Sequence, residues 1–115
     1  MIDETRSFAQ LLIENRKILQ KFADQGTDLG KTREIECCVG LNGTAACKDV
    51  RRIFRERYQV PAGGLFIVVD DPSDFRLMLL VEMMPAAETI SEIEEKLRSA
   101  SEGFDGAEVF WEFHA

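Results

Sequence analysis

The chain has 115 residues, of which 45% are hydrophobic and 30% are charged, and it contains only 3 proline residues. This composition excludes a disordered, collagen-like or low-complexity protein, and the chain is long enough to bury a core without disulfides or metals. The formal net charge of -7 disfavours direct binding of nucleic acid, because the surface as a whole repels phosphate.

The three cysteines, Cys37, Cys38 and Cys47, do not form the paired, spaced pattern of a disulfide framework. We therefore expect reduced thiols and a cytoplasmic protein. No secretory leader is expected at residues 1–6, which include two acids. The longest apolar run, Leu77–Val81, is far shorter than the roughly 20 residues that cross a bilayer, so no membrane segment is expected.

The first half of the chain predicts two helices and one strand. Residues 3–25 have apolar side chains three and four positions apart, which is typical of an amphipathic helix, and Gly26 is placed to end it in a left-handed conformation. Alternation over 33–39 predicts a half-buried strand. Asn42-Gly43-Thr44 then forms a turn and helix cap, followed by a basic helix over 45–57.

The second half predicts a hairpin, a helix and a final strand. Strands over 65–70 and 75–84 flank Asp71-Pro72-Ser73-Asp74, a strong turn sequence, so they pair antiparallel. Thr89 and Glu92 have the spacing of a capping box and predict a helix over about 90–101. Alternation over 107–113 predicts the last strand.

This order of elements predicts an α+β fold of the ferredoxin-like type. Its βαββαβ core forms a four-stranded antiparallel sheet with two helices on one face, and the chain adds an extra N-terminal helix. We expect a single domain over 1–115, with the helix in 1–25 and the core in 33–113. The extra helix covers apolar surface either at the end of the sheet or against the two other helices.

Alternation assigns one face of the sheet to the core and leaves the other as a candidate surface. The core face is predicted to carry Ile35, Cys37, Val39, Leu77, Leu79, Val81, Met83, Val109, Trp111 and Phe113. The opposite face is apolar at its centre and acidic at its rim, and we expect Phe66 and Val68 to join it. This composition is typical of an interaction surface. Alternatively, the N-terminal helix folds over this face, since the sequence does not orient that helix.

No arrangement of side chains predicts catalysis, a cofactor or a metal. His114 is the only histidine and lies at the chain end, and Gly63-Gly64 is too short for a phosphate loop. Cys37 and Cys38 point to opposite faces, whereas Cys47 starts a helix whose dipole could lower its pKa; a core position is the commoner role for such residues. The carboxylates of the last helix and hairpin turn are interpreted as solvated. The basic residues of helix 45–57 could meet an acidic partner or RNA, but a solvated face or a balance to the acidic sheet margins is the favoured interpretation. The carboxylates are Glu92, Glu94, Glu95, Asp70, Asp71 and Asp74, and the basic residues are Lys48, Arg51, Arg52, Arg55 and Arg57.

Two stretches resemble the regulator of ribonuclease activity B family. The first runs from Asp24 to Arg33, and the second comprises Met83-Met84-Pro85, the helix after it and Phe104-Asp105-Gly106. The resemblance covers roughly residues 15–113 and implies a ferredoxin-like core. Ala107 follows Asp105-Gly106 where the family usually has tryptophan, and Cys37-Cys38-Val39 replaces the usual aromatics of the first strand. These differences bear on the partner more than on the fold.

The resemblance implies a non-catalytic regulator that binds a protein partner, as the family's founding member binds ribonuclease E and restrains RNA decay. Asp105 and Gly106 are carried over as motif residues, with a tight turn as their simplest role. The candidate contact surface is the open sheet face: Glu36, Phe66, Met78, Leu80, Glu82, Glu108, Phe110 and Glu112. The alternative is a small-ligand-binding or sensory domain that forms a homodimer through the same face.

Overall fold

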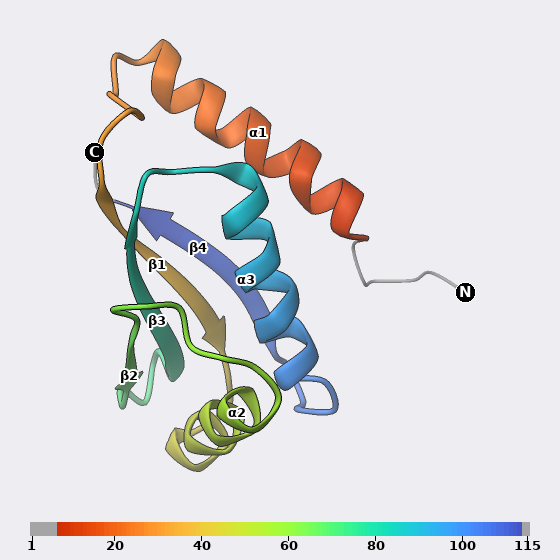
Figure 1. Cartoon of the computed structure of the whole chain (residues 1–115). Coiled ribbons are helices and arrows are strands. Elements are labelled where there is room, and N and C mark those ends of the chain that lie inside the picture. Colours follow the sequence, from red (N-terminus) through yellow and green to blue (C-terminus); the bar gives the residue numbers. More distant parts are fainter. Residues whose placement is uncertain (1–6, 114–115) are drawn as a thin grey trace.

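Seven elements follow one another in residues 7–113, the part of the chain that the structure, a computed structural model, describes. They form a mixed α+β fold of three helices and four strands, which confirms the predicted order of elements (Figure 1). The bounds are α1 Phe8–Asp24, β1 Arg33–Gly40, α2 Thr44–Arg57, β2 Leu65–Val69, β3 Arg76–Met83, α3 Ala87–Ala100 and β4 Glu108–Phe113. Residues 3–6 of the predicted N-terminal helix, and His114, lie outside the described residues.

The four strands form one antiparallel sheet in the order β2-β3-β1-β4. The predicted hairpin is confirmed, because β2 pairs with β3 from Leu65 opposite Leu80 to Val69 opposite Arg76. β1 lies in the middle of the sheet and pairs with β3 on one side and with β4 on the other. This leaves β2 and β4 as the two edge strands of the sheet.

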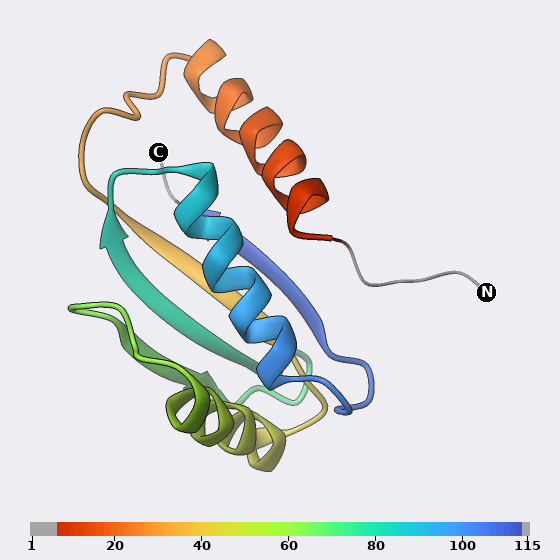
Figure 2. The same cartoon turned by 45° about the vertical axis from the view of Figure 1, so that its right-hand side comes forward.

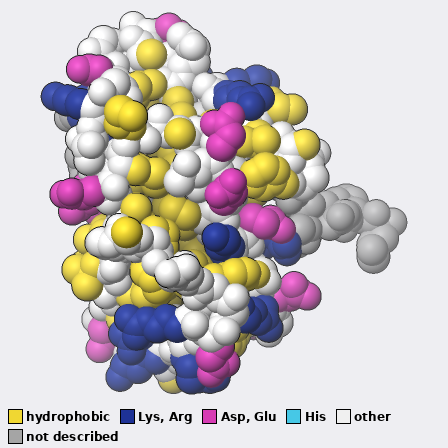
Figure 3. Space-filling view, viewed as in Figure 1, with side chains coloured by type: hydrophobic (Ala, Val, Ile, Leu, Met, Phe, Trp, Pro, Cys, Tyr) yellow, Lys and Arg dark blue, Asp and Glu magenta, His cyan; other side chains and the backbone are white. Residues whose placement is uncertain are grey.

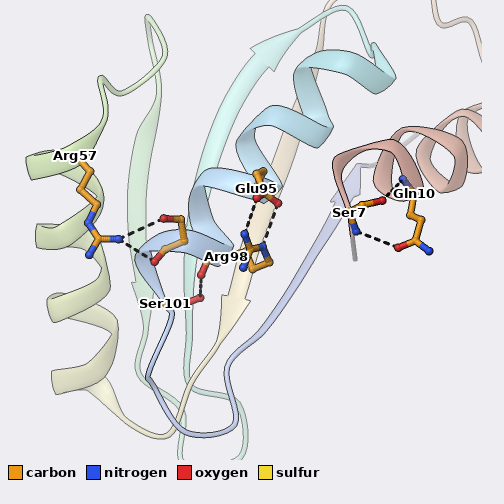
Figure 4. A network of polar contacts seen from close by, with 7 residues as sticks. Ser7, Gln10, Arg57, Glu95, Arg98 and Ser101 are labelled. Atoms are coloured by element: carbon orange, nitrogen blue, oxygen red, sulfur yellow. Dashed lines mark hydrogen bonds and ion pairs between the residues drawn. The ribbon is translucent and has the colours of Figure 1, made fainter. Parts of the chain in front are cut away.

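Helices α2 and α3 cover one face of the sheet and form the core with it (Figures 1 and 2). The predicted core face is confirmed, since every residue assigned to it belongs to the core cluster or packs against it. Phe54 of α2 and Ile90 and Leu97 of α3 are fully buried against these strands. Arg57 also ties α2 to α3 by donating to the backbone oxygen of Ser99 at 3.0 Å (Figure 4).

Helix α1 packs beside α3 near β4, on the helix side of the sheet (Figure 2). Asn15 of α1 holds it there through three hydrogen bonds, two of them buried. Its Nδ2 donates to Ser91 Oγ at 2.9 Å and to Glu94 Oε1 at 2.7 Å, while its Oδ1 accepts from Trp111 Nε1 at 2.7 Å. Glu94 is buried, so its interpretation as a solvated carboxylate is wrong. The ring of Phe22 also packs on that of Phe113, with centroids 4.4 Å apart. The sequence left open whether the N-terminal helix folds over the opposite sheet face. Helix α1 instead lies on the helix side of the sheet, so it does not cover that face.

The predictions of the helix ends are confirmed in one case and wrong in another. Gly26 follows α1 with φ +91°, which confirms its left-handed conformation. The capping box predicted at Thr89 and Glu92 is wrong, because α3 begins at Ala87 and places both residues inside the helix. This earlier start buries Ala87 together with Ile90, which offsets the absent cap. A capping box is instead present at Ser7 and Gln10, where each side chain accepts from the other residue's backbone N–H (Figure 4).

Substitution of Asn15 tests whether this side chain fixes α1. Asn15→Ala is expected to lower the free energy of unfolding by about 1–3 kcal/mol, because it leaves buried polar partners in α3 and β4 without their hydrogen bonds. Urea unfolding followed by circular dichroism measures the change. Gln20→Ala is the control, since Gln20 lies on α1 and bonds only the exposed Asp24, and it should change stability by less than about 0.5 kcal/mol. Equal effects of the two substitutions would contradict the anchoring role.

Candidate functional site

The sheet face opposite α2 and α3 carries two neighbouring cross-strand rows of side chains. The strand register sets these rows, because residues directly opposite one another point to the same face. One row runs Phe110, Cys38, Met78, Ile67, and the other runs Glu112, Glu36, Leu80, Leu65. We call this surface the open face. In these two rows the side chains from β2 and β3 are apolar, and the two carboxylates come from β1 and β4.

The open face is densely packed at its centre and exposed toward β2. Cys38 and Met78 are buried although they face away from α2 and α3, because larger side chains surround them. Leu65 is 57% exposed and Ile67 is 37% exposed, which is unusual for large aliphatic side chains that lie side by side. Leu80 is half-buried and lies between Glu36 and Leu65 in the second row. The face thus has an exposed apolar patch, and the side chains next to it are buried.

Two pairs of glutamates lie directly opposite each other on this face. Glu34 is opposite Glu82, and Glu36 is opposite Glu112. Like charges in such positions destabilise an antiparallel sheet, because their Cβ atoms are only about 4.5–5.5 Å apart. Arg76 contributes a positive charge at the other end of the face, but its Nε lies 3.3 Å from Asp74 Oδ2. The acidic end of the face is therefore suited to a positively charged partner.

Phe66 does not belong to the open face, so this part of the sequence prediction is wrong. Its ring is buried on the helix side, 5.4 Å from the ring of Phe54 and 5.3 Å from the guanidinium of Arg55. Val68, opposite the core residue Leu77, also points to the helix side. The five residues of β2 are all apolar, so alternation could not assign a face to them. The pairing of Leu65 with Leu80 and of Ile67 with Met78 places Leu65 and Ile67 on the open face, which the sequence analysis missed.

The other predicted residues of the open face lie on it, at differing depths. Glu36, Leu80 and Phe110 are half-buried, and Met78 is buried. The three carboxylates at the rim are exposed: Glu82, Glu108 and Glu112.

Asp105 and Gly106 form the turn that leads into β4. Gly106 has φ +72°, a conformation that residues with a side chain rarely adopt. Asn42 Nδ2 donates to the backbone oxygen of Asp105 at 2.8 Å and so joins this turn to the one before α2. A Cβ atom at Gly106 would lie 3.4 Å from Asn42 Oδ1. These contacts give the two motif residues a structural role in positioning β4.

A groove runs between α1 and β4, and sequence reasoning did not detect it. It consists of a hollow of about 520 Å³ and a second of about 340 Å³, which share Ile18 and Trp111 as lining residues. Every residue of Glu108–Phe113 lines one hollow or the other. Because alternate residues of a strand point to opposite faces, the hollows must follow the edge of β4 rather than one of its faces. We call this feature the α1–β4 groove.

The remaining charged groups form local contacts. The carboxyl of Asp71 has a lowered pKa because the backbone N–H and hydroxyl of Ser73 donate to it, and Arg98 lowers the pKa of Glu95 in the same way. Thr44 Oγ1 donates to Asp70, which links α2 to the hairpin turn. Basic side chains gather at the lower end of the molecule, over α2 (Figure 3). Within residues 7–113, no group of three histidine, cysteine or acidic residues could hold a metal ion.

All three thiols are buried and have raised pKa values. Burial and the charge of Glu94 raise the pKa of Cys37, whose side chain lies in the core. Burial raises the pKa of Cys38 to about 11, although Arg76 opposes the shift. Burial also raises the pKa of Cys47, so the suggestion that the start of α2 lowers it is wrong. These thiols are protonated near neutral pH and poorly reactive.

Thiol labelling tests this description. At pH 8 the rise in the pKa of Cys38 from 9.0 to about 11 reduces its thiolate fraction about 100-fold, so iodoacetamide should label the folded protein far more slowly than the urea-unfolded protein. Labelling of Cys38 should accelerate as the pH approaches 11. Because folded thiols keep protons that unfolded thiols lose, the free energy of unfolding should fall above about pH 9. Rapid labelling of a chain that circular dichroism shows to be folded would contradict these pKa shifts.

The structure contains no helix, within residues 7–113, that is long and apolar enough to cross a membrane. No curated protein matches the sequence. The family model of regulator of ribonuclease activity B (RraB) matches residues 12–112, nearly the whole chain and all four strands. The match extends through β1, the hairpin and the Asp105-Gly106 turn, and it includes most of α1. The chain belongs to the regulator of ribonuclease activity B family.

Proposed function

We propose that this protein is a non-catalytic cytoplasmic regulator that binds ribonuclease E through its open face and restrains RNA cleavage. Family membership supports a role in regulating a ribonuclease. The resemblance to the founding member suggests ribonuclease E as the partner. The observation that carries the proposal is the placement of two opposed glutamate pairs beside exposed Leu65 and Ile67 on one uncovered face.

The open face lowers the stability of the isolated protein in two ways. Opposed glutamates repel, and exposed leucine and isoleucine side chains lose the free energy that burial would provide. A partner that presents apolar side chains flanked by lysine or arginine relieves both costs at once. The half-buried Leu80 lies between Glu36 and Leu65 in the same row and would be covered at the centre of such a contact.

We also propose that the core has the ferredoxin-like arrangement and that 1–115 form a single domain. In support, α2 connects β1 and β2 with β3 between them, and α3 connects β3 and β4 with β1 between them. Such split βαβ units are the mark of that fold. The open face is then the sheet surface that this arrangement leaves uncovered.

Leu80→Arg tests the assignment of the contact surface. The arginine places a charge in the apolar patch, so binding to purified ribonuclease E in the absence of RNA should weaken by at least about tenfold. Surface plasmon resonance measures the affinity, and cleavage of a labelled RNA measures inhibition. Ile13→Arg is the matched control, because Ile13 is 52% exposed on α1, away from the open face, and should leave both unchanged.

The folding and binding of the Leu80→Arg variant show whether the open face is the contact surface. A folded Leu80→Arg variant that binds as the parent does would exclude the open face. Loss of folding would mean that Leu80 is a core residue; Leu65→Arg, at a more exposed position of the same row, then decides the assignment. Failure of the parent protein to bind ribonuclease E, together with a concentration-dependent mass, would favour the alternative of a dimer through this face.

Glu112→Gln separates binding from stability. Removing one charge of the Glu36–Glu112 pair should raise the free energy of unfolding by about 0.2–1 kcal/mol, because it ends the repulsion across the strands. The same substitution should weaken binding to ribonuclease E by removing a carboxylate that faces the partner. Urea unfolding and surface plasmon resonance measure the two effects. Glu92→Gln, at an exposed position of α3, should produce neither, and a loss of stability in Glu112→Gln would contradict the argument.

A further inference from the structure

We propose that the α1–β4 groove binds an extended, positively charged peptide segment, which adds a strand to the free edge of β4. This inference goes beyond the proposed function, because it concerns a second surface, the edge of β4 beside α1, although Glu108, Phe110 and Glu112 belong to both surfaces. It rests on three independent features of the groove: the backbone of β4, the apolar side chains beside it and the charges around it.

The first feature is the free edge of β4. Within the described residues, β4 pairs with β1 on one side and is the last strand of the sheet on the other. Alternate residues of an antiparallel strand direct their N–H and C=O groups away from the partner strand. In β4 these outward groups face the hollows that line its whole length, roughly 20 Å for six residues. An extended peptide matches such a site by forming backbone hydrogen bonds to the edge.

The second feature is the set of apolar side chains that α1 supplies along this edge. Ile18, which is 39% exposed, lines both hollows, and Phe22 lines the second. Trp111 lines both hollows with Ile18 and is held by its hydrogen bond to buried Asn15. Because the indole is already fixed, a ligand that packs on it loses little side-chain freedom of the protein. A strand edge beside a helix with apolar side chains forms a groove in which alternate side chains of a peptide can be buried.

The third feature is the charge of the groove. Glu14, Glu108 and Glu112 line it, whereas Lys17 is the one basic residue among those lining the two hollows. Arg98 borders an adjoining hollow, but it forms an ion pair with Glu95 at 2.6 Å. The charge therefore selects a peptide that carries lysine or arginine, and it disfavours an acidic one.

Peptide titration followed by Trp111 fluorescence tests the inference, since Trp111 is the only tryptophan of the chain and lines both hollows. The probe is the synthetic peptide Lys-Val-Arg-Ile-Lys-Val-Arg. Two control peptides have the same side chains with N-methylated internal amides, or glutamate and aspartate in place of the basic residues. The basic peptide should bind and change the emission, whereas neither control should bind.

Substitutions in α1 locate the site and test its charge. Ile18→Arg should weaken binding of the basic peptide at least about tenfold, whereas Ile13→Arg, on the same helix but outside the groove, should not. Lys17→Glu should strengthen binding up to about fivefold at low salt, and Lys21→Glu should have no such effect. Both pairs of variants carry matched changes on one helix, and circular dichroism confirms that they are folded.

Several results would overturn the inference. Equal binding of the N-methylated peptide would exclude strand addition, and equal binding of the acidic peptide would exclude the charge argument. Loss of binding in Leu80→Arg but not in Ile18→Arg would place the peptide on the open face instead. Absence of any binding would reject the groove while leaving the role of the open face in ribonuclease binding intact, since that role is measured separately.

Discussion

The hydrogen bonds of Asn15 determine which surfaces of this protein are free. They hold α1 against α3 and β4 on the helix side of the sheet, so the helix does not cover the opposite face. They also place α1 beside β4, where Trp111 bonds Asn15 and Phe113 packs on Phe22 of α1. The groove lies between these two elements. A single amide that bonds the buried Ser91 and Glu94 and the half-buried Trp111 thus defines both candidate binding surfaces.

The open face shows a conflict between stability and binding. The helix side of the sheet is well packed, whereas the open face keeps opposed carboxylates and exposed aliphatic side chains that destabilise the isolated molecule. Departures of this kind concentrate where a protein contacts something else, since selection on binding tolerates a local cost in stability. Among the described strand pairs of the core face, apolar side chains oppose apolar side chains, apart from Arg33 opposite Met83.

Much of the fold could be predicted from local patterns, and the exceptions have physical reasons. Glutamates alternate with apolar residues in β1 and β4, and Arg76 and Glu82 mark the open face near the two ends of β3, so the faces of these strands were assigned correctly. Strand β2 is apolar throughout, and only its register with β3 reveals that Phe66 is buried and Ile67 exposed. The placement of α1 depends on Asn15, one polar residue within an amphipathic helix, whose partners lie 76 or more residues away. The α1–β4 groove depends on that placement, so it could not be predicted from the sequence either.

The apolar edge strand β2 also makes the behaviour of this protein in solution depend on salt. Leu65–Val69 are five successive apolar residues at a sheet edge, without the lysine, proline or bulge by which edge strands commonly resist association with other sheets. What keeps molecules apart is the net charge of -7, and this repulsion acts over only about 8 Å at physiological ionic strength. Colloidal stability therefore decreases as salt increases, and storage at high concentration favours low ionic strength and a pH well above the isoelectric point.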